Sequence, residues 1–117
     1  MPYLLLIHEP TGQRATRSDA EGRAVYDRML GFAEELRRQG LLRAVESLVS
    51  QQDAVQVRLR QGRAQVLDGP FAEAKEMVGG FFLVDCATRE EAVALAQRCP
   101  AAEWATIEVR ATGPCFL

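Results

Sequence analysis

Two short apolar runs, Leu4–Ile7 and Phe81–Val84, place the strongest constraint on how this chain can fold. Both runs are continuous rather than alternating, which is typical of strands buried on both faces. A helix signal follows each run, because Ser18 and Thr88 each begin a sequence with the spacing of a capping box. The order strand, helix, strand is therefore expected twice, within a chain of 117 residues that suits one domain.

A different pattern separates these two halves. Residues Ala54–Arg60 alternate apolar and polar side chains, Gln61-Gly62 has the composition of a two-residue turn, and Arg63–Leu67 returns. This pattern predicts a β-hairpin with one solvated face. The whole chain, residues 1–117, is thus expected to form a single α+β domain. Its order is βαβ, hairpin, loop, βαβ, a ferredoxin-like plan with an antiparallel sheet.

The apolar runs also bear on assembly. Two helices can cover only one face of such a sheet, yet Leu4–Ile7 and Phe81–Val84 are apolar on both sides. Large bare apolar patches are uncommon on monomers. We therefore expect a homodimer whose sheets pack face to face, or a higher oligomer built from it.

Composition excludes several classes of function. The net charge is −2 and the basic residues are scattered, with Lys75 the only lysine, so nucleic-acid binding is not expected. No apolar run is long enough to cross a bilayer, and there is no secretory signal. The three cysteines have no CxxC spacing and indicate free thiols in a cytoplasmic protein. With one histidine, a metal site is not expected, and no cofactor is predicted.

The stretch between the hairpin and the second apolar run is dense in turn residues and charges. Asp68-Gly69-Pro70 is a turn signal, and Glu73, Lys75 and Glu76 are expected on a short helical turn that follows it. Gly79-Gly80 is expected to release the chain into the next strand. A loop of this composition is a candidate rim for a ligand site.

This stretch, Leu67–Gly80 with Phe81-Phe82 after it, resembles the signature of the DGPF-domain, YCII-related family. The opening Tyr3–His8 and the closing Arg98–Ala102 and Ile107–Arg110 are similar as well. The resemblance implies a dimeric α+β barrel. It also implies a His–Asp pair, here His8 and Asp68, in a cleft at the dimer interface.

The candidate site residues each allow two interpretations. His8 is either a general acid or base oriented by Asp68, or a strand-end histidine bonded to backbone or solvent. Asp68 also suits an Asx turn. Lys75 is a candidate clamp for an anionic ligand, and the remaining candidates for substrate binding are Phe71, Glu73, Glu46 and Ser47. The alternative is that these side chains have only structural roles, on a solvated face, at a strand bulge, or in core and dimer contacts.

Two functions follow as hypotheses. The first is a small-molecule-binding protein or cofactor-free enzyme, with isomerase- or lyase-like acid–base chemistry on a small organic acid. The second, suggested by the resemblance, is a non-catalytic accessory protein that partners an extracytoplasmic-function sigma factor.

Overall fold

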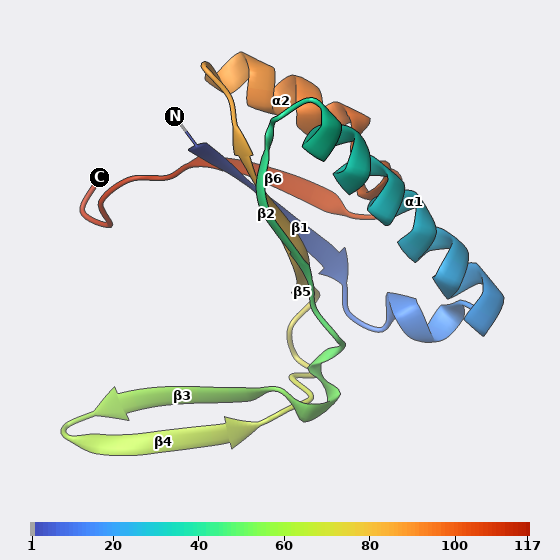
Figure 1. The fold of residues 1–117 in the computed structure, drawn as a ribbon. Coiled ribbons are helices and arrows are strands. Elements are labelled where there is room, and N and C mark those ends of the chain that lie inside the picture. The colour runs from blue at the N-terminus through green and yellow to red at the C-terminus, as the bar shows by residue number, and fades with distance from the viewer. Residues whose placement is uncertain (1) are drawn as a thin grey trace.

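The computed structural model describes residues 2–117 and contains six strands, two α-helices and three short 3-10 helices (Figure 1). The sequence-derived order of strand, helix, strand on either side of a hairpin is confirmed. In chain order the elements are β1 (Pro2–Pro10), η1 (Gln13–Thr16), α1 (Asp19–Arg38), β2 (Leu42–Ser47), η2 (Gln51–Asp53), β3 (Val55–Arg60), β4 (Arg63–Asp68), β5 (Glu76–Asp85), α2 (Arg89–Arg98), η3 (Pro100–Glu103) and β6 (Thr106–Ala111).

Four of the strands form one antiparallel sheet in the order β2-β5-β1-β6, with the two apolar runs in its two central strands. This is the strand order of a ferredoxin-like fold, so the predicted α+β class is correct. Strands β3 and β4 pair only with each other. The dimeric barrel stays a prediction.

Both helices lie on the same face of this sheet (Figure 1). Alternation along β1 turns Tyr3, Leu5 and Ile7 into the space under the helices, where all three are buried. Phe32 of α1 meets Phe82 of β5 edge to face, with ring centroids 5.3 Å apart. The opposite face of the sheet carries no helix, as the count of two helices predicts. No helix of residues 2–117 combines the length and the apolar character needed to cross a bilayer.

The predicted capping box at the start of α1 is present. The Ser18 hydroxyl accepts from the Glu21 amide at 3.1 Å, and the Glu21 carboxylate accepts from the Ser18 amide at 2.9 Å. The second predicted box is only half formed. Thr88 Oγ1 accepts from the Glu91 amide, but the Glu91 carboxylate accepts from the amide of Ala87 instead of Thr88.

The hairpin matches its prediction, and the loop after it does not. Gln61 and Gly62 both have positive φ, at 54° and 74°, as in the two-residue turns that suit twisted hairpins. The chain at residues 71–75 forms turns and no helix, so the expected helical turn is wrong. Strand β5 already begins at Glu76, and Gly79 is an extra residue in its ladder with β1, a bulge rather than a strand start.

Candidate functional site

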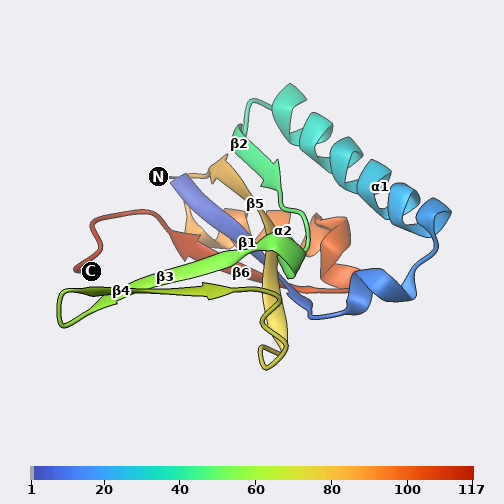
Figure 2. The ribbon, with the colours of Figure 1, turned by 90° about the horizontal axis from the view of Figure 1, so that it is seen from below.

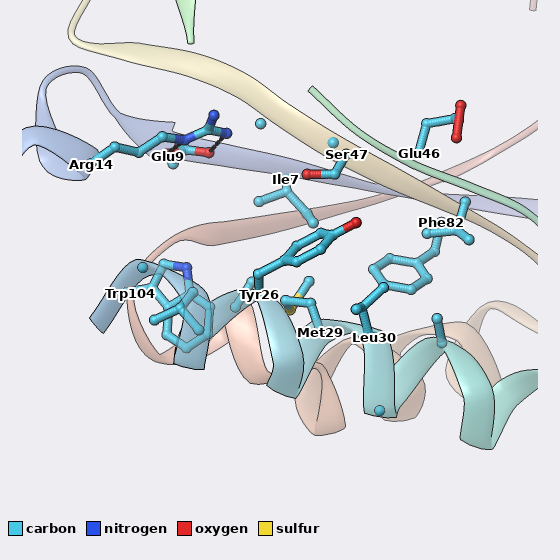
Figure 3. Close-up of a pocket in the computed structure, with 18 of the residues that line it drawn as sticks. Ile7, Glu9, Arg14, Tyr26, Met29, Leu30, Glu46, Ser47, Phe82 and Trp104 are labelled. Carbon is cyan, nitrogen blue, oxygen red and sulfur yellow. Dashed lines mark hydrogen bonds and ion pairs between the residues drawn. The ribbon is translucent and has the colours of Figure 1, made fainter. Parts of the chain in front are cut away.

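A cavity of about 810 Å³ lies between α1 and the helix-covered face of the sheet (Figure 3). Its volume falls in the range of sites that enclose small molecules. Tyr26, Met29 and Leu30 reach into it from α1, while Ile7 and Phe82 reach into it from the sheet. The cavity is therefore mostly apolar, and its few polar groups decide what it can bind.

One end of the cavity is closed by a buried ion pair. Glu9, only 6% exposed, accepts two bonds from Arg14, at 2.9 Å from Nε and 2.7 Å from Nη2. Arg14 also donates from Nη1 to the carbonyl of Leu48 at 2.8 Å, so each of its three guanidinium nitrogens makes a hydrogen bond. A buried carboxylate needs such a partner because its desolvation would otherwise be costly.

This ion pair depends on the bulge in β5. A Cβ built on Gly79 would lie 1.8 Å from Glu9 Oε1, far inside any allowed contact. The missing side chain therefore makes the room in which the Glu9 carboxylate sits.

Trp104 holds a second charged group at the cavity. The guanidinium of Arg17 lies 5.6 Å from the centre of its ring, and that of Arg28 lies 5.5 Å from it. Arg28 is engaged by the Glu103 carboxylate, whose hydrogen bond lowers the pKa of Glu103 and raises the pKa of Arg28. Among residues 2–117, Arg17 has no carboxylate within ion-pair distance, although its charge acts on the Glu21 carboxylate at longer range and helps to lower the pKa of Glu21.

The other charged side chains of the cavity wall are either paired with each other or turned away from α1. Glu34 and Arg37 pair with each other at 2.7 Å. Glu46 has no ion-pair partner within the described chain, and its side chain turns away from α1 in Figure 3. The hydroxyls of Tyr26 and Ser47 line the cavity, and neither has a hydrogen-bond partner among the described residues. The cavity thus offers one guanidinium and two hydroxyls to a ligand.

His8 lies on the other side of the sheet. It follows Ile7 and precedes Glu9, both of which point under the helices, so its own side chain faces the helix-free side. There its Nε2 lies 2.8 Å from Oε1 of Glu108 on β6. A histidine held in this way by a carboxylate keeps Nδ1 available for proton transfer.

Asp68, the predicted partner of His8, lies in a different sheet from His8. Asp68 is the last residue of β4, is exposed, and pairs in the ladder with Val55. Within the described chain it makes no hydrogen bond or ion pair to His8, so the His8–Asp68 pair stays a prediction about the assembled protein. Phe71, Glu73 and Lys75 lie in the loop between β4 and β5, and none of them lines the cavity.

Of the predicted substrate-binding residues, the structure places Glu46 and Ser47 in the cavity wall. The sequence analysis missed Glu9, Arg14, Arg17 and Tyr26. The burial of Glu9 could have been predicted, because Glu9 lies on the same face of β1 as the buried residues Leu5 and Ile7. Within residues 2–117, no three His, Cys, Asp or Glu side chains gather closely enough to hold a metal ion.

The fold and the cavity define a ferredoxin-like α+β protein with room for a small molecule between its first helix and its sheet. The family model of the YCII-related domain matches residues 1–114, and the chain belongs to the YCII-related family. It is similar to an uncharacterised protein of Rhizobium meliloti (strain 1021). The two are 33% identical over 97 residues, which cover 83% of this chain and 78% of that protein.

Proposed function

We propose that this protein binds a small organic acid with an apolar body in the cavity between α1 and the sheet. The observation that carries the proposal is Arg17, a guanidinium with no carboxylate at ion-pair distance in residues 2–117, held on Trp104 at the edge of a mainly apolar space. Guanidinium groups recognise carboxylates through paired, charge-assisted hydrogen bonds.

The remaining charges support this choice of ligand. Arg14 is bonded to Glu9 and to a backbone carbonyl, and Arg37 is bonded to Glu34, so both guanidiniums already have a carboxylate partner at ion-pair distance. The apolar lining favours a ligand with a hydrophobic ring or chain, because burying that surface contributes about 25 cal/mol per Å². The hydroxyls of Tyr26 and Ser47 would add hydrogen bonds to oxygen atoms of the ligand.

Isothermal titration with 1-naphthoate and its neutral analogue 1-naphthamide tests the proposal. The acid should bind more tightly than the amide, and Arg17→Gln should weaken binding of the acid by about 10- to 100-fold, since a charged hydrogen bond contributes about 1.5–3 kcal/mol. Binding of the amide should change little.

Arg23→Gln is the matched control. Arg23 lies on α1, six residues after Arg17; it is exposed, pairs with Asp19 at 2.9 Å and lies outside the cavity wall. Equal affinity for acid and amide, or equal losses in the Arg17 and Arg23 variants, would refute the role of Arg17.

A second function is favoured by a separate observation, the 2.8 Å contact between His8 Nε2 and Glu108 Oε1. This pair suits general acid–base chemistry on a small organic acid, with Glu108 fixing the ring tautomer and Nδ1 exchanging the proton. Because His8 is the only histidine, its ring nitrogens can be read without assignment. Nitrogen NMR should find the neutral ring protonated at Nε2, and a mixed tautomer in Glu108→Gln. A ring protonated at Nδ1 in the unmodified protein would exclude this arrangement.

A further inference from the structure

The wall of the cavity contains a carboxylate that anion binding by Arg17 does not use. Glu9 lies near the end of β1, its side chain is 8% exposed, and it is part of the cavity wall. Two buried glycines, Gly79 and Gly80, line the wall with it. A stretch of wall without side chains lets a ligand come close to the Glu9 carboxylate.

Arg14 uses part of the hydrogen-bonding capacity of this carboxylate. The short helix η1 joins the end of β1 to the start of α1 (Figure 2) and brings Arg14 back to Glu9. There Nε donates to Oε2 at 2.9 Å, and Nη2 donates to Oε1 at 2.7 Å. An ionised carboxylate has about four acceptor sites, two on each oxygen. These two bonds occupy one site on each oxygen, so each oxygen keeps a second site for a donor.

Stability alone does not explain an ion pair at this place. The desolvation of two charges offsets most of their attraction, and replacing a buried pair by apolar side chains of similar volume is often neutral or stabilising. The pair also requires the glycine bulge in β5, because a Cβ on Gly79 would lie 1.8 Å from Glu9 Oε1. In mostly apolar ligand sites, a few polar groups placed in this way orient the bound molecule.

The polar groups of the cavity gather at one end. Figure 3 shows Trp104 and Glu9 on one side of Tyr26, and Phe82 on the other. Arg17 belongs with the first group, since its guanidinium lies 5.6 Å from the centre of the Trp104 ring. A ligand whose carboxylate meets Arg17 would therefore have the neighbouring atoms beside Glu9 and its apolar body towards Phe82.

We propose that the ligand is a hydroxy acid with its hydroxyl group on the carbon next to the carboxylate. This inference rests on the proposed function and names the class of acid that the cavity takes. The carboxylate of the ligand pairs with Arg17, and the hydroxyl donates its proton to Glu9. Both contacts are charge-assisted hydrogen bonds, which are shorter and stronger than neutral ones.

Charge favours a hydroxyl over an ammonium group as the donor. Glu9, Arg14 and Arg17 lie at the same end of the cavity and together carry one net positive charge, which a singly charged anion balances. An ammonium group would place a further cation beside two guanidiniums, and like charges repel strongly in a partly desolvated site. Glu46 could attract such a group, but it lies on the Phe82 side of the cavity in Figure 3.

Isothermal titration with acids that share a phenyl body tests the donor. The acids are 3-phenylpropionate, 3-phenyllactate, which adds the 2-hydroxyl group, and 2-fluoro-3-phenylpropionate, whose fluorine has no proton to donate. One enantiomer of 3-phenyllactate should bind about 10-fold more tightly than either of the others, because it adds a hydrogen bond to a charged acceptor. Phenylalanine, with an ammonium group on the same carbon, should bind more weakly than 3-phenyllactate.

A double variant shows whether Glu9 is the acceptor. Glu9→Met with Arg14→Met replaces the ion pair by apolar side chains of similar length and leaves no buried charge unpaired. This variant should bind 3-phenylpropionate and 3-phenyllactate equally well. Arg43→Met with Asp85→Met is the matched control and should keep the preference, because that pair, at 3.6 Å, is exposed and lies outside the cavity wall. Far-UV circular dichroism checks folding, and the comparison of acids in the unmodified protein does not depend on either variant.

The outcomes separate this inference from the function on which it rests. Equal affinity for 3-phenylpropionate and 3-phenyllactate, tighter binding of phenylalanine, or a hydroxyl preference that survives in the Glu9 and Arg14 double variant would overturn the role of Glu9. Binding of 1-naphthoate that still depends on Arg17 would in each of these cases leave the proposed function standing. Failure of every acid to bind would refute both.

Discussion

Replacing Gly79 with alanine is the sharpest test of how the cavity is built. The new Cβ would lie 1.8 Å from Glu9 Oε1 and 2.9 Å from Glu9 Cδ, so the carboxylate must move by more than 1 Å to restore an allowed contact. That movement breaks the 2.7 Å bond from Arg14 Nη2 and leaves a carboxylate that is 6% exposed without its partner.

The expected cost follows from these contacts. Breaking a buried ion pair costs about 3–5 kcal/mol, and the 34% exposure of the Arg14 side chain places this pair at or below the low end. Alanine regains roughly 0.5–1 kcal/mol of backbone entropy. Gly79→Ala should therefore lower the free energy of unfolding by about 2 kcal/mol. Urea unfolding at a fixed protomer concentration measures this change.

Gly31→Ala is the control with the same chemical change. Gly31 lies within α1, and nothing stands within 4 Å of a Cβ built there. Alanine should raise stability at this position by about 0.5–1 kcal/mol. In a Glu9→Ala background the cost of Gly79→Ala should disappear, because the clashing carboxylate is gone. A Gly79→Ala protein that unfolds at the same urea concentration as the unmodified chain would contradict this account of the cavity.

Two further predictions concern the helix start and the thiols. Ser18→Ala should cost about 1 kcal/mol at pH 7, because it removes the cap of α1. The hydrogen bonds from Ser18 lower the pKa of Glu21 below its usual 4.5; the benefit of the charged Glu21 is therefore present above that value and is lost as pH falls through the folded-state pKa. Ser18→Ala keeps the backbone amide, which is the largest cause of this shift, and removes only the hydroxyl, so the gap to the unmodified protein in urea unfolding should narrow only slightly towards pH 3; a gap that widens with acid would refute the linkage. Burial raises the pKa of the Cys99 thiol, whereas Cys115 is exposed. Ellman's reagent should therefore modify Cys115 rapidly and Cys99 only after unfolding. Fast modification of Cys99 in the native protein would show that its surroundings are open.

The parts of the fold that sequence predicts well depend on local chemistry. The Ser18 box needs only residues three apart, and the turn at Gln61-Gly62 needs only two residues that accept positive φ. The alternation of apolar and polar side chains in β3 and β4 likewise predicts the two faces of the hairpin without any distant contact. These elements have the bounds that the sequence indicates to within one or two residues.

One error arises where a glycine has a tertiary role. Gly79-Gly80 reads as a break before a strand, because glycine lowers strand propensity. In the folded chain Gly79 is instead the place where β5 makes room for the Glu9 carboxylate, a contact between residues 70 positions apart. Local sequence contains no sign of that contact, and so β5 was expected to begin four residues too late.

The cavity was only partly predictable for a related reason. The phase of β1 alone could have identified Glu9 as buried, and a buried carboxylate requires a partner. Which of the arginines meets it depends on η1, which brings Arg14 back toward the end of β1. Arg17 and Trp104 meet from elements 87 residues apart, and no spacing rule connects them.

The motif Asp68-Gly69-Pro70-Phe71 has a structural role at the base of the hairpin formed by β3 and β4. Gly69 donates its amide to the carbonyl of Ala54 at 2.6 Å, and a Cβ on it would lie 2.5 Å from the carbonyl oxygen of Gln51. Position 69 therefore has to be glycine, because the two ends of the β3–β4 hairpin lie against each other there. A chain could keep this motif and its hairpin while changing Arg17 or Tyr26 in the cavity. Such chains would share the fold, and the cavity residues would determine which molecule each one binds.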